Sequence, residues 1–123
     1  MIAIDTYGWL ERFLDGPKAA VYNRLIDSVT PGELVTSVVS VYEVYKKLRR
    51  AQGESKALEA VVHLKETILV PLDELLALEA ADYSLSLSLH FSDAVVYATA
   101  RRYNAELHTS DPDLRSAPGV VFH

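Results

Sequence analysis

The chain has 123 residues, enough for one domain with a sizeable core, and its lack of cysteine excludes stabilisation by disulfide bonds. The net charge of -5 argues against a protein whose whole surface binds nucleic acid, because phosphate contacts need lysine and arginine. No uncharged stretch approaches the ~18 residues of a membrane span, and the start, MIAID, lacks the basic and apolar parts of a secretion signal. We therefore expect a cytoplasmic protein with a single domain, residues 1–123.

Short strand-like runs, several of them apolar, alternate with segments of helical periodicity along the whole chain. Strands are predicted at Ile2–Ile4, Leu34–Thr36, Ile68–Val70, Ala105–His108 and Val120–Phe122. Helices are predicted at Thr6–Leu14, Lys18–Val29, from Ser37 onward, and at Glu54–Lys65, Asp73–Leu87 and Ser92–Arg102. This alternation predicts an α/β fold, a three-layer α/β/α sandwich around a central parallel sheet.

The stretch Leu89–Leu114 holds the densest group of candidate functional residues. Ser92 is a candidate N-cap, which would put Asp93 in the first turn of the helix that follows. Asp111 lies in the turn after the strand Ala105–His108, where the next residue, a proline, disfavours helix. The carboxyl ends of strands and the N-termini of helices face one crevice in an open α/β sheet. We therefore expect these two carboxylates to converge.

Three further acids complete the candidate set. Asp5 ends the first strand, Glu43 lies in the helix that starts near Ser37, and Asp113 follows Asp111 in the same turn. Each acid also has an ordinary structural explanation as a cap, a capping-box residue, a partner of a helix dipole or a turn residue. Crowded carboxylates raise one another's pKa, so the economical partner is a hard divalent ion. Mg²⁺ or Mn²⁺ suits oxygen ligands, whereas zinc would want histidine or cysteine.

Four motifs, in this order, resemble those of the PIN-domain ribonucleases, and among these the VapC-like toxins of prokaryotic toxin–antitoxin pairs. The motifs are IAIDT at residues 2–6, SVYEV at 40–44, SDAVVYATA at 92–100 and LHTSDPDL at 107–114. The resemblance implies that the family's four acids correspond to Asp5, Glu43, Asp93 and Asp111. It also implies that the hydroxyl positions beside them correspond to Thr6, Thr109 and Ser110.

The resemblance further implies metal-dependent cleavage of an RNA phosphodiester. Mg²⁺ or Mn²⁺ held by Asp5, Asp93 and Asp111 would lower the pKa of a bound water, which would attack phosphorus in line. Glu43 would hold a ligand water or a second ion. The products would carry 5′-phosphate and 3′-hydroxyl ends. Asp111 is preferred over Asp113 as the ligand, because it is nearer the strand and we expect Asp113 to point into solvent.

The resemblance implies three partners: an RNA substrate, a small antitoxin that lays an apolar helix in a groove, and a second copy of the chain. The residues considered for that groove or for a homodimer contact are Trp9, Leu10, Phe13, Tyr42 and Tyr45. A basic cluster could guide RNA toward the acids. Its members are Lys46, Lys47, Arg49 and Arg50.

Other interpretations stay open. Metal-free RNA cleavage through the 2′-hydroxyl would need an acid and a base, and His90 and His108 lie near the last two motifs. A magnesium-binding phosphatase or receiver-type domain also uses acids at strand ends, although Asp5 lacks the second acid that such phosphatases place two residues on. A catalytically silent PIN-like binding module is the third alternative. Two observations would separate these classes: whether the protein cleaves RNA, and whether it binds Mg²⁺ or Mn²⁺ in a way that Asp5→Asn abolishes.

Overall fold

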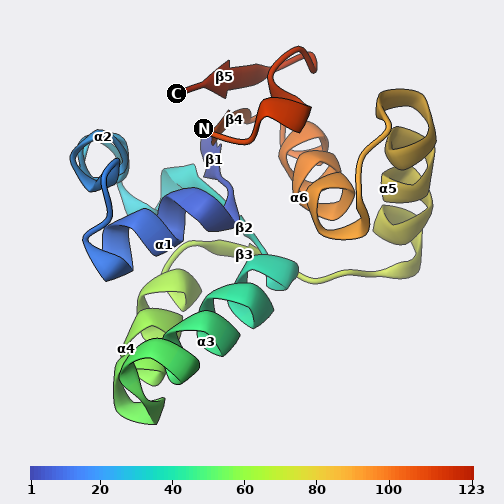
Figure 1. The fold of residues 1–123 in the computed structure, drawn as a ribbon. Helices are drawn as coiled ribbons and strands as arrows, with labels where there is room; N and C mark the ends of the chain where they lie inside the picture. Colours follow the sequence, from blue (N-terminus) through green and yellow to red (C-terminus); the bar gives the residue numbers. More distant parts are fainter.

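Five short strands form one sheet in the computed structural model, which describes residues 1–123 (Figure 1). The strands are β1 (Ile2–Ile4), β2 (Leu34–Ser37), β3 (Ile68–Val70), β4 (Glu106–Thr109) and β5 (Val120–Phe122). They follow the order β3-β2-β1-β4-β5, and every neighbouring pair is parallel. In register, Ala3 of β1 pairs with Val35 on one side and with Leu107 on the other.

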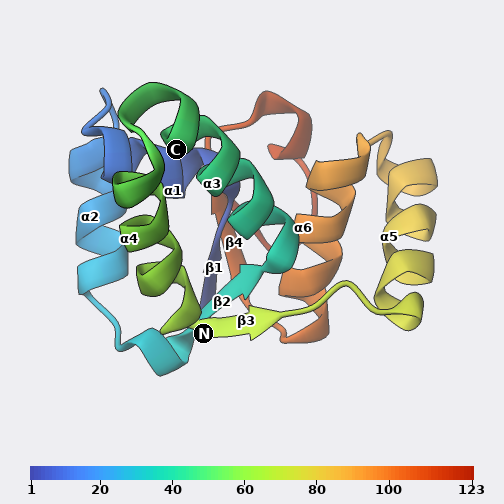
Figure 2. The same cartoon turned by 90° about the horizontal axis from the view of Figure 1, so that it is seen from below.

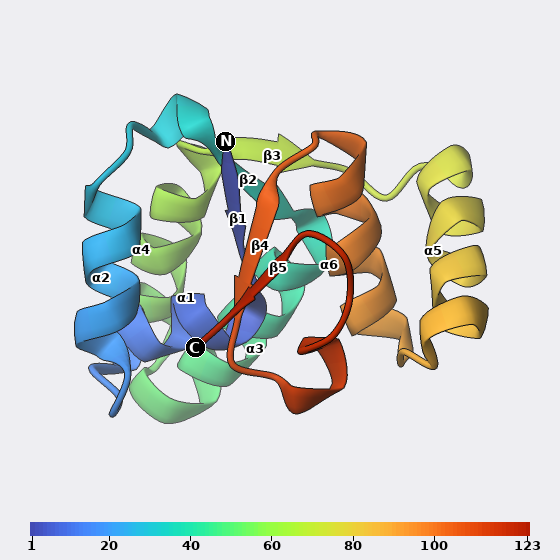
Figure 3. The same cartoon turned by 90° about the horizontal axis from the view of Figure 1, so that it is seen from above.

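Helices cover both faces of this sheet (Figures 2 and 3). One side carries α1 (Thr6–Leu14), α2 (Ala19–Asp27), α3 (Val38–Gln52) and α4 (Glu54–Lys65), and the other carries α5 (Glu74–Leu87) and α6 (Phe91–Arg102). Two short 3-10 helices occupy Pro31–Glu33 and Pro112–Leu114. The predicted three-layer α/β/α architecture is confirmed. None of the helices combines the length and the apolar character that crossing a membrane requires.

The core consists of two hydrophobic clusters, one on each face of the sheet. Successive side chains of a strand point to opposite faces, so Ala3 joins the cluster under α5 and α6 while Ile4 joins the cluster under α1 to α4. The first cluster also contains Val95, and the second contains Tyr22 and Leu48. Both clusters therefore depend on the same central strand.

The strand order sets the position of a crevice. From β1 the chain moves outward to β2 and β3, and then returns to the other side of β1 to form β4 and β5. Open α/β sheets bind ligands at such a reversal, outside the carboxyl ends of the strands. Here the reversal lies between β1 and β4, and the residues that follow these strands are Asp5 and Ser110.

Several bounds differ by one residue from the sequence-based expectation: α2, α3 and α5 begin one residue later, β2 ends one residue later, β4 is shifted by one residue, and α6 begins one residue earlier. The expected cap at Ser92 is wrong, because α6 begins at Phe91 and His90 occupies the N-cap position without a side-chain cap bond. A left-handed Ser88 (φ 55°) turns the chain sharply after α5 and brings Leu89 into the core, so α6 starts one residue earlier. The second helix is also shorter than predicted and spans Ala19–Asp27.

Candidate active site

Asp5 is the most buried acid at the carboxyl edge of the sheet, with 6% of its surface exposed. It follows β1 and caps α1, since its Oδ1 accepts a hydrogen bond from the Gly8 N–H at 2.9 Å. Its Oδ2 accepts a hydrogen bond from the Thr109 hydroxyl of β4. Burial raises the pKa of Asp5 to about 6 against the effect of these bonds, and the charges of Asp111 and Glu43 add to the rise.

Asp93 approaches the same edge from the first turn of α6 and is half-buried. Burial raises the pKa of this carboxyl to about 7, and the neighbouring Asp111 adds to the rise through its charge and a shared hydrogen bond. The charges of Asp5 and Glu43 act in the same direction. Asp93 therefore keeps its proton to a higher pH than an ordinary aspartic acid while no cation is close to it.

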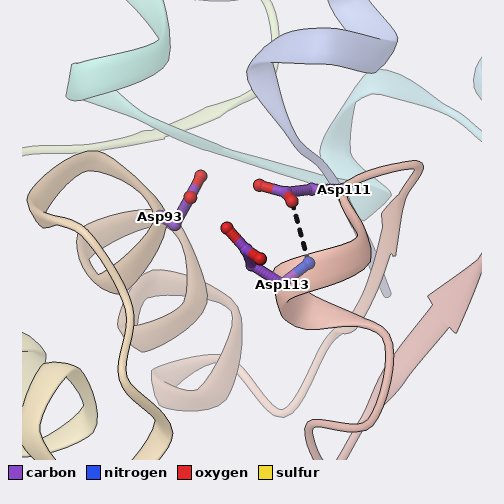
Figure 4. Close-up of side chains that lie close together, drawn as sticks. All are labelled: Asp93, Asp111 and Asp113. Atoms are coloured by element: carbon purple, nitrogen blue, oxygen red, sulfur yellow. Dashed lines mark hydrogen bonds between the residues drawn. The ribbon is translucent and has the colours of Figure 1, made fainter.

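Asp111 and Asp113 flank the proline that starts the second 3-10 helix. Asp111 caps that helix by accepting the Asp113 N–H at 2.9 Å, and its own N–H donates to Thr109 Oγ1 at 3.0 Å. One carboxylate oxygen each from Asp93, Asp111 and Asp113 lies within 4.8 Å of the others (Figure 4). Asp113 is exposed, as expected, yet its carboxylate lies within reach of Asp93 and Asp111.

Glu43 reaches the site from the middle of α3. Its Oε1 accepts a hydrogen bond from Thr6 Oγ1 at 2.7 Å, and the same Thr6 oxygen lies 3.0 Å from the hydroxyl oxygen of Ser40. This contact joins the first turn of α1 to α3. Residues three apart on a helix share a face, so Ser40 could have been found from its position relative to Glu43, although it was missed.

All of these acids except Asp113 line one cavity of about 340 Å³ at the carboxyl edge of the sheet. The acids among its lining residues are Asp5, Glu43, Asp93 and Asp111, and the hydroxyl residues are Thr6, Tyr7 and Ser110. No acid of this cavity forms an ion pair with lysine or arginine, and neither does Asp113. All four expected acids therefore line one cavity without a compensating cation from the protein, but only Asp93 and Asp111 belong, with Asp113, to the group whose oxygens lie within 4.8 Å of one another.

Tyr22 supports the site and was missed by sequence reasoning. Tyr22 belongs to α2 and is completely buried, and its hydroxyl lies 2.6 Å from Ser110 Oγ, just after β4. The two residues are 88 positions apart, so no local pattern connects them. Tyr22 therefore fixes the turn that carries Ser110 through a contact that only the tertiary structure creates.

The two histidines considered for metal-free catalysis lie outside this cavity. His108 is buried in β4, with its Nδ1 2.9 Å from His123 Nε2 and the two rings stacked. Burial lowers the pKa of His108. His90 is exposed and precedes α6. The structure gives neither ring a position among the acids.

Two of three comparisons with known proteins found matches, one to solved structures and one to a family model. No curated protein matches the chain. Solved structures with the same fold include a toxin–antitoxin complex from Klebsiella pneumoniae, with a TM-score of 0.80 and 21% identity over 98% of this chain and 96% of that one. They also include VapC20 of Mycobacterium tuberculosis, a sarcin-ricin loop cleaving toxin, with a TM-score of 0.81 and 21% identity over 96% of this chain and 95% of that one. VapBC2 from Rickettsia felis, bound to a DNA fragment from its promoter, has a TM-score of 0.73 and 14% identity over 100% of this chain and 98% of that one.

At these identities the solved structures show the fold alone. The sequence itself carries the assignment to a family, because the model of the PIN domain matches residues 2–120, nearly the whole chain. That match, on a fold whose carboxyl edge gathers four acids, shows that the chain belongs to the PIN-domain family.

Proposed function

We propose that this PIN domain is a metal-dependent endoribonuclease and the toxin of a toxin–antitoxin pair. The observation that carries the proposal is the convergence of Asp5, Glu43, Asp93 and Asp111 on one cavity without a lysine or arginine paired to any of them. Membership of the PIN-domain family supports a nuclease, and the likeness to toxin structures supports the biological role. Family membership also leaves the phosphatase and receiver alternatives without support.

The residues of the cavity fit a hard divalent ion. Their donor atoms are carboxylate oxygens, which suit Mg²⁺ or Mn²⁺, and the raised pKa values of Asp5 and Asp93 are those of acids that lack a nearby cation. Asp5, Asp93 and Asp111 would hold the ion, and Asp113 is a further candidate because its carboxylate lies within reach of two of them. When bound, the ion supplies a water of lowered pKa and positive charge to stabilise the phosphate in the transition state.

The protein's own groups hold these acids in place. The Gly8 N–H and the Thr109 hydroxyl each hold one oxygen of Asp5, so its carboxylate cannot rotate. Thr6 holds one oxygen of Glu43, which leaves the other oxygen to orient a water molecule. Attack of water in line with the leaving 3′-oxygen gives products with a 5′-phosphate and a 3′-hydroxyl.

The expected partners follow from the toxin role. An RNA is the substrate, and a cognate antitoxin would inhibit the protein by covering the acidic cavity. Several structures of similar fold are toxin–antitoxin complexes, which supports an antitoxin here. A second copy of the chain is the other expected partner. Of the residues considered for these contacts, Trp9 is buried in the core, whereas Tyr42 is exposed.

The deciding experiment incubates the purified protein with structured RNAs in Mg²⁺, in Mn²⁺ or in EDTA. We expect cleavage only with metal, 5′-phosphate ends on the products, and loss of cleavage in Asp5→Asn and Asp93→Asn. Asp82→Asn is the matched control, because Asp82 is exposed on α5 and outside the cavity. Cleavage at the full rate in EDTA would exclude the metal mechanism, and cyclic phosphate ends would indicate attack by the 2′-hydroxyl. Metal binding without cleavage of any RNA would favour a silent binding module.

A further inference from the structure

A second cavity, of about 460 Å³, lies between α1 and α3 and is lined by cations. Its charged lining residues are Glu43, Lys46, Lys47 and Arg50. Thr6 and Glu43 line both this cavity and the acidic one, so the two cavities adjoin along the contact between α1 and α3. We call the second one the basic cavity.

The cations of the basic cavity are not neutralised by the protein. Lys46, Lys47 and Arg50 take part in no ion pair, whereas the neighbouring Arg49 turns to Glu54 at 3.7 Å. The chain has 17 acidic residues and 12 lysines and arginines, so acidic partners are not scarce. Three unpaired cations beside a cavity of unpaired acids separate the two signs of charge on adjoining surfaces. An anionic ligand that extends from the acidic cavity into the basic one would be attracted by the cations of the basic cavity.

Helical spacing arranges these residues in a row that leads away from the acids. Glu43, Lys47 and Arg50 are four and then three residues apart, so they share one face of α3. At 1.5 Å per residue, Lys47 and Arg50 lie about 6 Å and about 10 Å along the helix axis from Glu43. A chain of phosphates that starts at the acidic cavity would meet these two residues in turn.

Tyr42 gives the basic cavity an aromatic surface. Its side chain is 64% exposed, and Lys46 Nζ lies 5.6 Å from the centre of its ring. Proteins that bind single-stranded nucleic acid combine cations along the backbone with aromatic rings on which bases stack. The basic cavity contains both components.

We infer that the basic cavity binds the RNA strand on one side of the cleaved bond. Lys46, Lys47 and Arg50 contact its phosphates, and Tyr42 stacks on a base. This inference rests on the proposed function, because the acidic cavity is taken as the point of cleavage. The phosphate contacts bind any sequence, and the tyrosine adds a contact to one base without a hydrogen-bond code.

The test measures RNA binding separately from cleavage. Anisotropy of a labelled single-stranded RNA, in EDTA over a series of salt concentrations, compares the wild type with the triple variant Lys46→Gln/Lys47→Gln/Arg50→Gln. The control is Arg24→Gln/Lys56→Gln/Lys65→Gln, which makes the same change of charge with exposed residues of α2 and α4. We expect the first variant to bind at least about tenfold more weakly, with a salt slope reduced by about 2, near 0.7 for each lost phosphate contact.

Tyr42 is tested in the same assay by two substitutions. Tyr42→Ala removes the ring and should weaken binding about tenfold, whereas Tyr42→Phe keeps the ring and should bind like the wild type. Shortening the RNA on one of its two sides should weaken binding to the wild type but not to the triple variant. If shortening the RNA no longer weakens binding once the three cations are replaced, the cations and that part of the strand contact each other.

The outcomes separate this inference from the proposed function. If the wild type binds no RNA, or if the two triple variants bind equally well, the inference is wrong and the cations serve another partner, such as an acidic protein segment. If RNA is cleaved normally but the affinity and salt slope do not depend on the basic cavity, only the inference fails. If metal-dependent cleavage is absent while binding depends on the basic cavity, the proposed function fails and the inference stands.

Discussion

At the scale of single residues, Thr109 connects the acids that follow the two central strands. The side chain is fully buried, and its hydroxyl donates to Asp5 Oδ2 while accepting the Asp111 N–H at 3.0 Å. A substitution at this position therefore changes the electrostatics of one acid and the orientation of another. Thr109 thus links the two strand ends of the candidate site.

Thr109→Val is expected to raise the pKa of Asp5 above about 6, because the Thr109 hydroxyl is the largest influence that lowers this pKa. The loss of a buried hydrogen-bond donor should also reduce the free energy of unfolding by about 1–3 kcal/mol. Titration of the carboxyl carbon by NMR and denaturation by urea measure the two effects. Thr109→Ser keeps the hydroxyl and serves as the control. An unchanged Asp5 pKa in the valine variant would show that the bond does not stabilise the carboxylate.

Asp93 should make stability depend on pH in metal-free buffer. Its pKa rises from an ordinary value of 3.8 to about 7 on folding, so the folded state holds the proton more tightly than the unfolded state. The free energy of unfolding should therefore fall as the pH rises from about 4 to about 7 and then level off. In Asp93→Asn we expect a gain of about 1 kcal/mol at pH 8, reduced by solvent screening, and almost no gain at pH 4.

Urea denaturation in EDTA at the two pH values measures this dependence, with Asp82→Asn as the control. Mn²⁺ should reverse the order at pH 8, because a ligand that binds only the folded state stabilises it and the wild type has the additional carboxylate. A loss of stability in Asp93→Asn at pH 8 in EDTA would mean that its interaction with the dipole of α6 outweighs the repulsion.

The choice between Asp111 and Asp113 is tested by their asparagine variants. Asp111 is half-buried and lines the acidic cavity, whereas Asp113 is exposed and does not. We expect Asp111→Asn to lose more Mn²⁺ affinity and more cleavage than Asp113→Asn. Asp111→Asn should cost little stability, because asparagine also serves as a helix cap. A silent Asp111→Asn beside an inactive Asp113→Asn would move the metal toward the second 3-10 helix.

At the scale of elements, α1 can hold the Asp5 cap only because Gly8 has no side chain. A Cβ added there would lie 2.5 Å from Ile4 Cγ2 and 2.5 Å from Tyr22 Cε1. We expect Gly8→Ala to destabilise the protein by about 1–3 kcal/mol, despite the higher helix propensity of alanine, and to weaken Mn²⁺ binding as the helix shifts. Gly32→Ala is the control, since its Cβ would meet only Thr30 Oγ1 at 4.0 Å. If urea denaturation gives Gly8→Ala the same stability as the wild type, α1 and α2 can move apart enough to admit the added Cβ at little cost.

At the scale of the whole molecule, the two hydrophobic clusters share one five-stranded sheet, which predicts that residues 1–123 unfold as a single cooperative domain. Far-UV and near-UV circular dichroism should report the same thermal midpoint. Leu76 belongs to the cluster on the α5 and α6 side and Leu48 to the other. Leu76→Ala and Leu48→Ala should each cost about 2–5 kcal/mol without splitting the transition. Two separate midpoints in either variant would indicate two folding units.

Local sequence determined most of the elements of this fold. Short strand-like runs between helical segments predicted all five strands, and the runs at Ile2–Ile4, Ile68–Val70 and Val120–Phe122 are wholly apolar, as a parallel sheet covered on both faces favours. Asn104 follows α6 in the left-handed conformation (φ 52°), which asparagine adopts more readily than most residues. The start of α6 was missed because it depends on the turn at Ser88 and on the packing of Leu89, which a cap motif at Ser92 does not reveal.

The sequence by itself also indicated which acids to consider, since the carboxyl ends of parallel strands and the N-termini of helices face one edge of the sheet. Only the tertiary structure decided how they meet. The hydroxyl of Thr109 on Asp5, the return of the Asp113 carboxylate toward Asp93, and the contact of Tyr22 with Ser110 join segments far apart in the chain or depend on a tight cap. Periodicity and capping rules describe interactions over a few residues, whereas these distances are set by how the strands and helices pack.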